Sequence, residues 1–291
     1  MGEPQSDASE EPGTAIKRVE GHLRGELGLA LYWRAWLPTA QPRAVVAIAH
    51  GVFEHSGRYA HVAERLARAG FATYALDHRG HGRSEGRRGN IGRMAHLVAD
   101  LDKLVLLIGH RHPGRAVFLL GHSMGGAIAL QYAFQRQGTL AGLILSAPAV
   151  DVSGVSSLQV RIAKLLSAIA PKLRILTVDS SKISRDPAVV RAYNDDPLVY
   201  RGKAPARTIA DVITTAEQLC GCAHELTLPL LVMHGTGDSL VALAGSRIVH
   251  DRARCADKTL NLYEGLYHEV LNEPEKDCVI GDLLDWLVER S

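Results

Sequence analysis

Short apolar runs alternate with stretches of helical periodicity along most of the 291-residue chain. Continuous apolar runs are typical of parallel strands buried on both faces of a sheet, and apolar residues at three- and four-residue spacing are typical of the covering helices. The pattern therefore predicts an α/β fold with a mostly parallel central sheet and helices on both faces. The predicted strands lie at 29–37, 44–51, 71–80 including a turn, 117–120, 140–149, 229–235 and 259–265; the predicted helices lie at 61–70, 96–114, after Ser123, at 243–253 and from Pro274.

The alternation stops after Pro148 and resumes at residue 229. Residues from about 151 to 225 contain no convincing buried strand, which indicates an inserted helical cap on a single α/β domain. The expected organisation is a core at residues 21–150 and 226–291, with the cap at residues 151–225. Residues 1–20 begin with the acidic, polar segment MGEPQSDASEEPG and are expected to form a disordered N-terminal arm.

Residues 117–130, VFLLGHSMGGAIAL, combine an apolar run, a serine between glycines and small residues that begin a helix. Ser123 is the centre of a G-x-S-x-G match in the strand-turn-helix context that this motif requires. The glycines relieve crowding around a sharply turned serine, so its hydroxyl is exposed at the carboxyl edge of the sheet. Ser123 is therefore the predicted nucleophile, in preference to a buried hydroxyl in a tight turn.

A serine nucleophile needs a histidine base and a carboxylate, in the chain order Ser, Asp or Glu, His for this architecture. Asp238 follows the strand that resumes the sheet pattern, and His268 follows the last predicted strand, so both can converge on Ser123. Asp238 alone would equally suit a turn or a helix N-cap. His234 and His250 are weaker candidates for the base, because His234 lies in a turn before Asp238 and His250 lies on a helix.

Acyl transfer also needs two backbone N–H groups directed at the developing oxyanion. Met124, directly after the nucleophile, is predicted to supply one of them. Val52 is predicted to supply the other, because His50-Gly51 at the end of the strand at 44–51 resembles the HG loops of lipases and esterases.

Composition and charge argue against several other classes of protein. The formal net charge is +2 without a long Lys/Arg block, so a nucleic-acid partner is not expected. The four cysteines show neither zinc-ribbon nor disulfide-framework spacing, which favours reduced thiols. The chain lacks a signal-peptide pattern and a membrane-spanning run, so a cytoplasmic protein is expected. No metal site is expected at the histidine pairs His78/His81 and His110/His112, because no acidic or cysteine ligand completes either set.

From about Arg43 to its C-terminus, the chain resembles the monoacylglycerol lipases of the α/β-hydrolase superfamily. The resemblance rests on the segments HGVFEHSGRY, LDHRGHGRSEG, LLGHSMGGAIA, ISRDPAVVRAYNDDPLV and YEGLYHEVLNEPE, of which the fourth, in the cap, is the most specific. It implies an α/β-hydrolase fold with a helical cap. It also implies hydrolysis of a monoacylglycerol or similar lipid ester, without a cofactor, by Ser123, Asp238 and His268.

The same resemblance implies that Glu54, Arg58 and Tyr193 lie near the glycerol-accepting end of the pocket. Surface charges at Glu54 and Arg58, and a packing role for Tyr193 in the cap, remain open alternatives. Phe53 departs from the family pattern, which often has glycine after the oxyanion donor, and this bears on the loop geometry and on the width of the pocket mouth.

Apolar residues in the cap segment VSSLQVRIAKLLSAIA, residues 155–170, fall on one helical face: Val155, Leu158, Ile162, Leu165 and Ile169. We expect this face to pack against the main domain. The alternative is that part of it stays exposed and contacts a membrane surface, with Arg161 and Lys164 near anionic head groups. The sequence also leaves open a lysophospholipase, a broad carboxylesterase and an inactive lipid-binding protein of the same fold.

Overall fold

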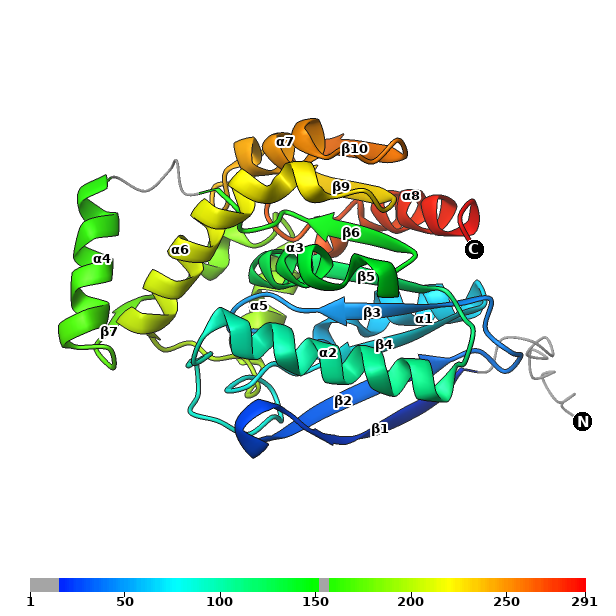
Figure 1. Cartoon of the computed structure of the whole chain (residues 1–291), viewed down its shortest axis with the longest axis horizontal. Coiled ribbons are helices and arrows are strands. Elements are labelled where there is room, and N and C mark those ends of the chain that lie inside the picture. Colours follow the sequence, from blue (N-terminus) through cyan, green and yellow to red (C-terminus); the bar gives the residue numbers. More distant parts are fainter. Residues whose placement is uncertain (1–15, 152–156) are drawn as a thin grey trace, which may run out of the picture.

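The structure is a computed structural model that describes residues 16–151 and 157–291. Within these residues the centre is an eight-stranded sheet in the order β1-β2-β4-β3-β5-β6-β9-β10 (Figure 1). Strand β2 is antiparallel to β1 and β4, and the other neighbouring pairs are parallel, so the predicted mostly parallel sheet is confirmed. The strands are β1 (Lys17–Arg24), β2 (Ala30–Leu37), β3 (Ala44–Ala49), β4 (Phe71–Leu76), β5 (Val117–His122), β6 (Gly142–Ser146), β9 (Leu230–Gly235) and β10 (Lys258–Tyr263).

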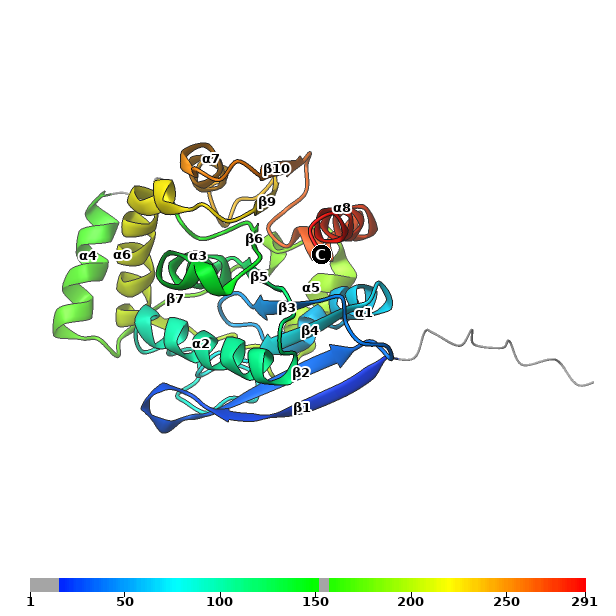
Figure 2. The ribbon, with the colours of Figure 1, turned by 45° about the vertical axis from the view of Figure 1, so that its right-hand side comes forward.

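Helices cover both faces of the sheet (Figure 2). One face carries α2 (Met94–Arg111), α3 (Met124–Arg136) and α7 (Leu243–Arg252), and the other carries α1 (Ala60–Arg68) and α8 (Lys276–Val288). Two apolar clusters fill the spaces between these helices and the sheet; on the α8 side, for example, Trp286 packs edge-on against Phe118 with ring centroids 5.8 Å apart. Because helices cover both faces, β3, β4, β5, β6 and β9 are buried along their whole length, which explains their continuous apolar sequences.

Strand β1 was missed by the sequence prediction. Residues 17–20, which were expected to belong to a disordered arm, form the first half of this strand and pair with β2. The edge strand alternates between exposed and half-buried positions, and Val19 and Leu23 are its only large aliphatic residues. So polar an edge strand lacks the apolar run that revealed the others.

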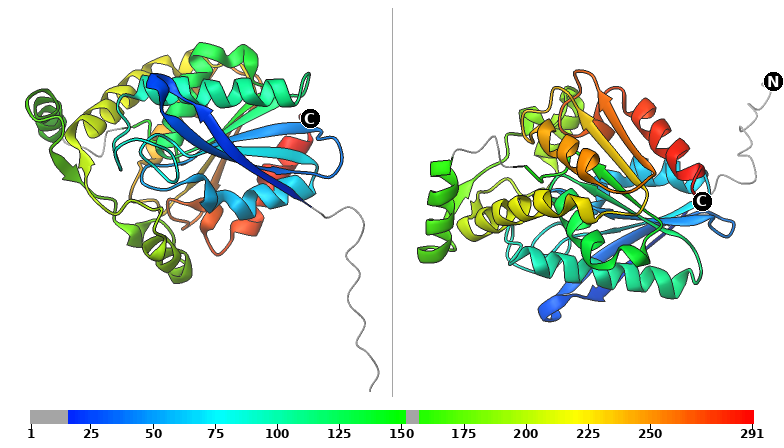
Figure 3. Two further views of the ribbon diagram at one scale, coloured as in Figure 1. Left: turned by 90° about the horizontal axis from the view of Figure 1, so that it is seen from below. Right: turned by 45° about the horizontal axis from the view of Figure 1, so that its top comes forward.

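The chain between β6 and β9 forms the cap, which lies at the carboxyl edge of the parallel strands. Figure 1 shows the arrowheads of β3 and β6 pointing toward the side where the cap helices lie. The cap contains α4 (Ser157–Ile169), α5 (Pro187–Asp195), α6 (Ala206–Cys222) and a small sheet of β7 (Arg174–Leu176) and β8 (Ala204–Pro205). Helix α4 lies at the outer edge of the molecule, beside α6 (Figure 3).

Candidate active site

Ser123 lies at the sharp turn between β5 and α3. Its backbone has φ 55° and ψ −120°, a left-handed conformation that costs a non-glycine residue roughly 1–3 kcal/mol. The turn also needs glycine beside it, because a Cβ atom at Gly125 would lie 2.0 Å from the Ala49 carbonyl oxygen at the end of β3. The G-x-S-x-G match therefore forms the strained strand-to-helix turn that exposes a serine hydroxyl above the sheet.

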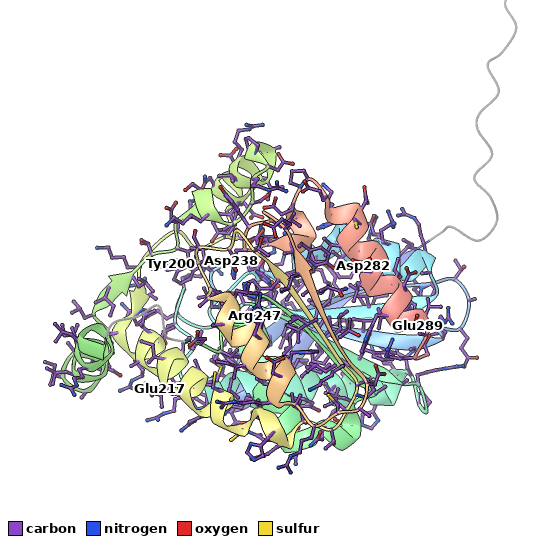
Figure 4. All side chains as sticks on the ribbon, turned by 90° about the horizontal axis from the view of Figure 1, so that it is seen from above. Tyr200, Glu217, Asp238, Arg247, Asp282 and Glu289 are labelled. Carbon is purple, nitrogen blue, oxygen red and sulfur yellow. The ribbon has the colours of Figure 1, made fainter. Side chains whose placement is uncertain are left out.

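Asp238 and His268 lie together after the last two strands of the sheet. His268 Nδ1 is 2.7 Å from Asp238 Oδ2, and the two side chains are 7% and 0% exposed. Figure 4 shows Asp238 on the side of the core that faces the cap residue Tyr200, away from Asp282 and Glu289 on α8. A buried carboxylate bonded to Nδ1 directs the other ring nitrogen of His268 outward as a proton acceptor.

Asp238 is stabilised as a carboxylate despite its burial. Burial opposes ionisation, but the rings of His234 and His268 beside the carboxylate outweigh it and lower the pKa of Asp238 well below its usual range. The other carboxylate oxygen, Oδ1, accepts backbone N–H groups of Leu240 at 2.7 Å and Val241 at 3.0 Å. The carboxylate is thus charged and fixed in orientation at neutral pH.

The loop after β3 lies against the serine turn. Val52 and Met124 both line the cavity that contains Ser123, and within residues 16–151 and 157–291 neither backbone N–H has a hydrogen-bond acceptor. Glu54 Oε1 accepts the Gly51 N–H at 2.6 Å, which closes the loop into a tight turn. Both N–H groups are therefore available, within the described residues, for the predicted role of oxyanion donors.

Phe53 has a left-handed backbone, with φ 70°, a conformation that glycine adopts without strain. The side chain is 2% exposed and packs edge-on against Tyr200 of the cap, with ring centroids 5.3 Å apart. Its carbonyl oxygen also accepts the Tyr200 N–H at 2.8 Å. The ring thus joins the loop to the cap and is not part of the lining of the cavity that contains Ser123.

The three residues assigned to the polar end of the pocket form one buried cluster with Glu269. Arg58 donates two hydrogen bonds of 2.6 Å to Glu269 and one of 2.8 Å to Glu54. Its guanidinium lies 4.8 Å from the centre of the Tyr193 ring. Glu54 and Arg58 are therefore not surface charges, because their side chains are only 4% and 10% exposed.

The two carboxylates of this cluster share a single arginine. Burial raises the pKa of Glu54, since the attraction of Arg58 is partly cancelled by repulsion from Glu269. Burial also opposes the ionisation of Glu269, but its bidentate pairing with Arg58 outweighs this and lowers its pKa. Glu269 therefore makes the stronger ion pair with Arg58, and Glu54 is the carboxylate that takes up a proton more readily.

Sequence reasoning missed Glu269, although it directly follows His268. A charged residue beside the predicted base was the available signal. Its partner Arg58 is distant in sequence, so no local pattern indicated the pairing.

A cavity of about 690 Å³ lies between the carboxyl edge of the sheet and the cap. Ser123, His268, Glu54, Glu269 and Tyr193 line its polar part, whereas Arg58 lies behind them. The cap supplies most of its apolar lining, including Ile162, Leu166, Ile175, Val212 and Ile213. The cavity thus joins an apolar compartment to a small polar one, with Ser123 on its wall.

The buried histidines His50, His78 and His81 lie close together near the site. His50 accepts the His78 N–H through Nε2 at 2.9 Å, so its Nδ1 carries a proton and donates to the Gly51 carbonyl at 2.7 Å. Burial lowers the pKa of His50 well below its usual range, that of His78 to about 3 and that of His81 to about 4. These rings are neutral at pH 7 and pack behind the loop after β3.

The expectation that the apolar face of α4 packs against the main domain is wrong for the described residues. Leu158, Ile162, Leu165 and Ile169 are 65%, 47%, 59% and 71% exposed. Val155 lies outside the described residues. Helix α4 has its main contacts with α6 and lies at the outer edge of the molecule (Figure 3).

Comparison with known proteins identifies the family. Residues 40–275 match the family model described as serine aminopeptidase, S33. Over 274 residues the chain is 43% identical to the monoacylglycerol lipase of Mycolicibacterium smegmatis, with 94% of this chain and 98% of that protein covered. It is 36% identical over 274 residues to the monoglyceride lipase of Homo sapiens, with 93% and 90% covered. The crystal structure of Paleococcus ferrophilus monoacylglycerol lipase matches with a TM-score of 0.80 at 30% identity and covers 95% of this chain and 100% of that one. Together with the serine turn and the buried Asp–His pair, these matches show that the chain belongs to the monoacylglycerol lipase family of α/β-hydrolases.

Proposed function

We propose that this protein is a serine esterase that hydrolyses monoacylglycerols to fatty acid and glycerol. The observation that carries the proposal is the placement of His268, paired with Asp238 at 2.7 Å, on the same cavity wall as the strained Ser123. Relatives named monoacylglycerol or monoglyceride lipase match nearly the whole chain and support this substrate class.

In this mechanism His268 Nε2 takes the Ser123 hydroxyl proton as Oγ attacks the ester carbonyl. The N–H groups of Val52 and Met124 stabilise the tetrahedral oxyanion, and Asp238 stabilises the imidazolium. Collapse of the intermediate breaks the bond to the glycerol oxygen, which leaves with the proton from His268. Water, deprotonated by the same histidine, then hydrolyses the acyl-enzyme.

The two compartments of the cavity suit the two parts of a monoacylglycerol. The acyl chain fits the apolar part beneath the cap, and the glycerol fits the polar part beside Glu54 and Glu269. Two carboxylates with one arginine give this polar end a net negative charge when both are ionised. A phosphate leaving group would be repelled there, which favours a neutral glycerol over a lysophospholipid head group.

The experiment combines active-site labelling with a substrate panel. A fluorophosphonate probe should label the wild type and not Ser123→Ala, and this variant should lose at least about 10⁴-fold in kcat. Hydrolysis rates on monoacylglycerol, diacylglycerol, lysophosphatidylcholine and short p-nitrophenyl esters should be highest for monoacylglycerol. Unchanged labelling and activity in Ser123→Ala would refute the mechanism, and a preference for lysophosphatidylcholine would refute the substrate.

We further propose that the exposed face of α4 contacts lipid surfaces. Leu158, Leu165 and Ile169 are followed in the chain by the exposed Leu173 and Leu176, and Arg161 on the same helix is also exposed. A face of this kind can bury its apolar side chains at the head-group boundary while its basic residues meet anionic lipids. Among the helices of the described chain, none is long and apolar enough to cross a bilayer.

Liposome co-sedimentation tests this second proposal. Leu158→Asp should weaken binding to vesicles that contain anionic lipid. The matched control is Leu106→Asp, because Leu106 is a 52% exposed leucine on α2, away from the cap. Equal binding by the wild type and both variants would exclude a membrane role for α4.

A further inference from the structure

A second histidine, His234, contacts the carboxylate of Asp238. His234 is the penultimate residue of β9, and its Nε2 lies 3.1 Å from Asp238 Oδ2, the oxygen that also binds His268. The side chains of His234 and Asp238 are both 0% exposed. The acyl-transfer mechanism described above assigns this histidine no role.

Ser246 and Asp238 bind the two ring nitrogens of His234, and the acceptor-only carboxylate favours a proton on Nε2. This fully buried serine lies on α7, and its Oγ is 2.7 Å from His234 Nδ1. When the hydroxyl donates to Nδ1, the ring proton is on Nε2, and the N–H group faces the carboxylate. The opposite tautomer would bring two lone pairs together, Nε2 against Asp238 Oδ2, in a site closed to water.

We propose that His234 is a positioning residue of the triad, which keeps the Asp238 carboxylate oriented toward His268 through an N–H group that Ser246 fixes in place. The Nε2–H bond deviates from the straight line to Oδ2, so the contact is a short charge–dipole interaction rather than an ideal hydrogen bond. It completes the surroundings of the carboxylate, whose other oxygen is bound by two backbone N–H groups. The inference rests on the proposed function, because it acts through Asp238 and His268.

The contact has a consequence for the base. A carboxylate that shares its charge with two ring N–H groups attracts the His268 imidazolium less than one that has only His268 as partner. Removal of the His234 donor should therefore make His268 easier to protonate, and should also let the carboxylate rotate. The other titratable groups near this pair are His122, with a ring centroid 4.7 Å from that of His268, and Glu269, which is paired with Arg58.

The test compares replacements that keep or remove the donor. His234→Gln retains an N–H donor three bonds from Cβ, as in the histidine ring, whereas His234→Phe keeps the ring volume without a donor. His112→Phe is the matched control, because His112 is a partly buried histidine at the end of α2 that pairs with Tyr74, outside the cavity. Rates on p-nitrophenyl butyrate are measured from about pH 5 to about pH 9 and divided by the fraction of sites that a fluorophosphonate titrates.

His234→Phe should move the acid limb of the kcat/KM profile to higher pH by about 0.5–1 unit and lower the plateau about five- to tenfold. His234→Gln and His112→Phe should keep the wild-type midpoint. A plateau that falls without a shift of the midpoint would indicate only a structural role and overturn the proposal, as would an equal shift in His234→Gln.

If His234→Phe does not fold, Ser246→Ala replaces it in the test. This variant keeps the histidine ring and removes only the hydroxyl that holds its Nδ1 in place. A shift of the acid limb in the same direction supports the proposal, and an unshifted profile overturns it. A wild type that neither reacts with fluorophosphonate nor hydrolyses esters would instead refute the proposed function.

Discussion

Replacement of Glu269 by alanine should destabilise the fold, because it leaves a buried arginine with one partner in place of two. Arg58 makes three charge-assisted hydrogen bonds, and Glu269 accepts the two shortest, at 2.6 Å each. The side chains of Arg58 and Glu269 are 10% and 6% exposed, so water cannot readily replace the lost contacts. The free energy of unfolding should therefore fall.

The expected loss is about 3 kcal/mol. Removal of one partner of a buried ion pair costs about 3–5 kcal/mol. The lower end applies because Glu54, at 2.8 Å, still pairs with Arg58 and no longer experiences repulsion from Glu269. For a domain of this size such a loss corresponds to a decrease in Tm of about 6–10 °C.

Urea unfolding followed by circular dichroism measures the effect, with Glu54→Gln for comparison. Glutamine at position 54 keeps an acceptor for the Gly51 N–H, but its NH2 group then faces Arg58 in place of the accepting oxygen. This variant should therefore lose about 1–2 kcal/mol at pH 8, less than Glu269→Ala. Because the folded pKa of Glu269 lies below its ordinary value of 4.5, its contribution is complete above that pH. This contribution is lost as the pH falls from 4.5 through the folded pKa of Glu269, so the free energies of unfolding of the wild type and Glu269→Ala should become equal there. A loss below about 1 kcal/mol for Glu269→Ala at pH 8, or an equal loss for Glu54→Gln, would refute the reasoning.

Three further outcomes are expected. Acid should lower the free energy of unfolding from pH 6.5 downward to about 4. Burial lowers the folded pKa of His78 from 6.5 to about 3 and that of His81 from 6.5 to about 4, so the unfolded chain binds more protons in this range. Urea titrations at several pH values measure the slope of the free energy of unfolding against pH. His78→Phe should reduce this slope by about one proton, or about 1.4 kcal/mol per pH unit, because neither ring nitrogen of the buried His78 has a partner within the described residues. An unchanged slope would show that His78 does not contribute. Phe53→Gly should relieve about 1 kcal/mol of backbone strain but lose about 3–5 kcal/mol of ring packing, a net loss of about 2–4 kcal/mol in urea unfolding; a more stable variant would contradict the packing role of this ring.

The sequence predicted the parallel sheet because burial on both faces makes β3, β5 and β6 apolar along most of their length. It indicated Ser123, Asp238 and His268 because each lies in the turn or loop after a strand, where the topology restricts which side chains can meet. Their assigned roles remain predictions that the labelling and kinetic experiments test.

Features that depend on distant partners were not predictable in this way. Glu269 pairs with a residue far away in the chain, and His234 was considered only as a base and set aside, since nothing local showed its contact with Asp238. The exposed face of α4 was misjudged because an amphipathic pattern is the same whether its apolar side meets a protein core or remains open.

The contact between Gly125 and the Ala49 carbonyl oxygen has a consequence for how this site can change in evolution. Ala49 ends the strand that leads into the Val52 loop, so the spacing between the nucleophile and one oxyanion donor depends on two main chains that touch each other. Side chains of the cap can then be exchanged, and the preferred acyl chain with them, while the acyl-transfer geometry is inherited unchanged. The smallest change that would disable the site is a single methyl group at Gly125, although it alters neither charge nor any residue that touches the ester.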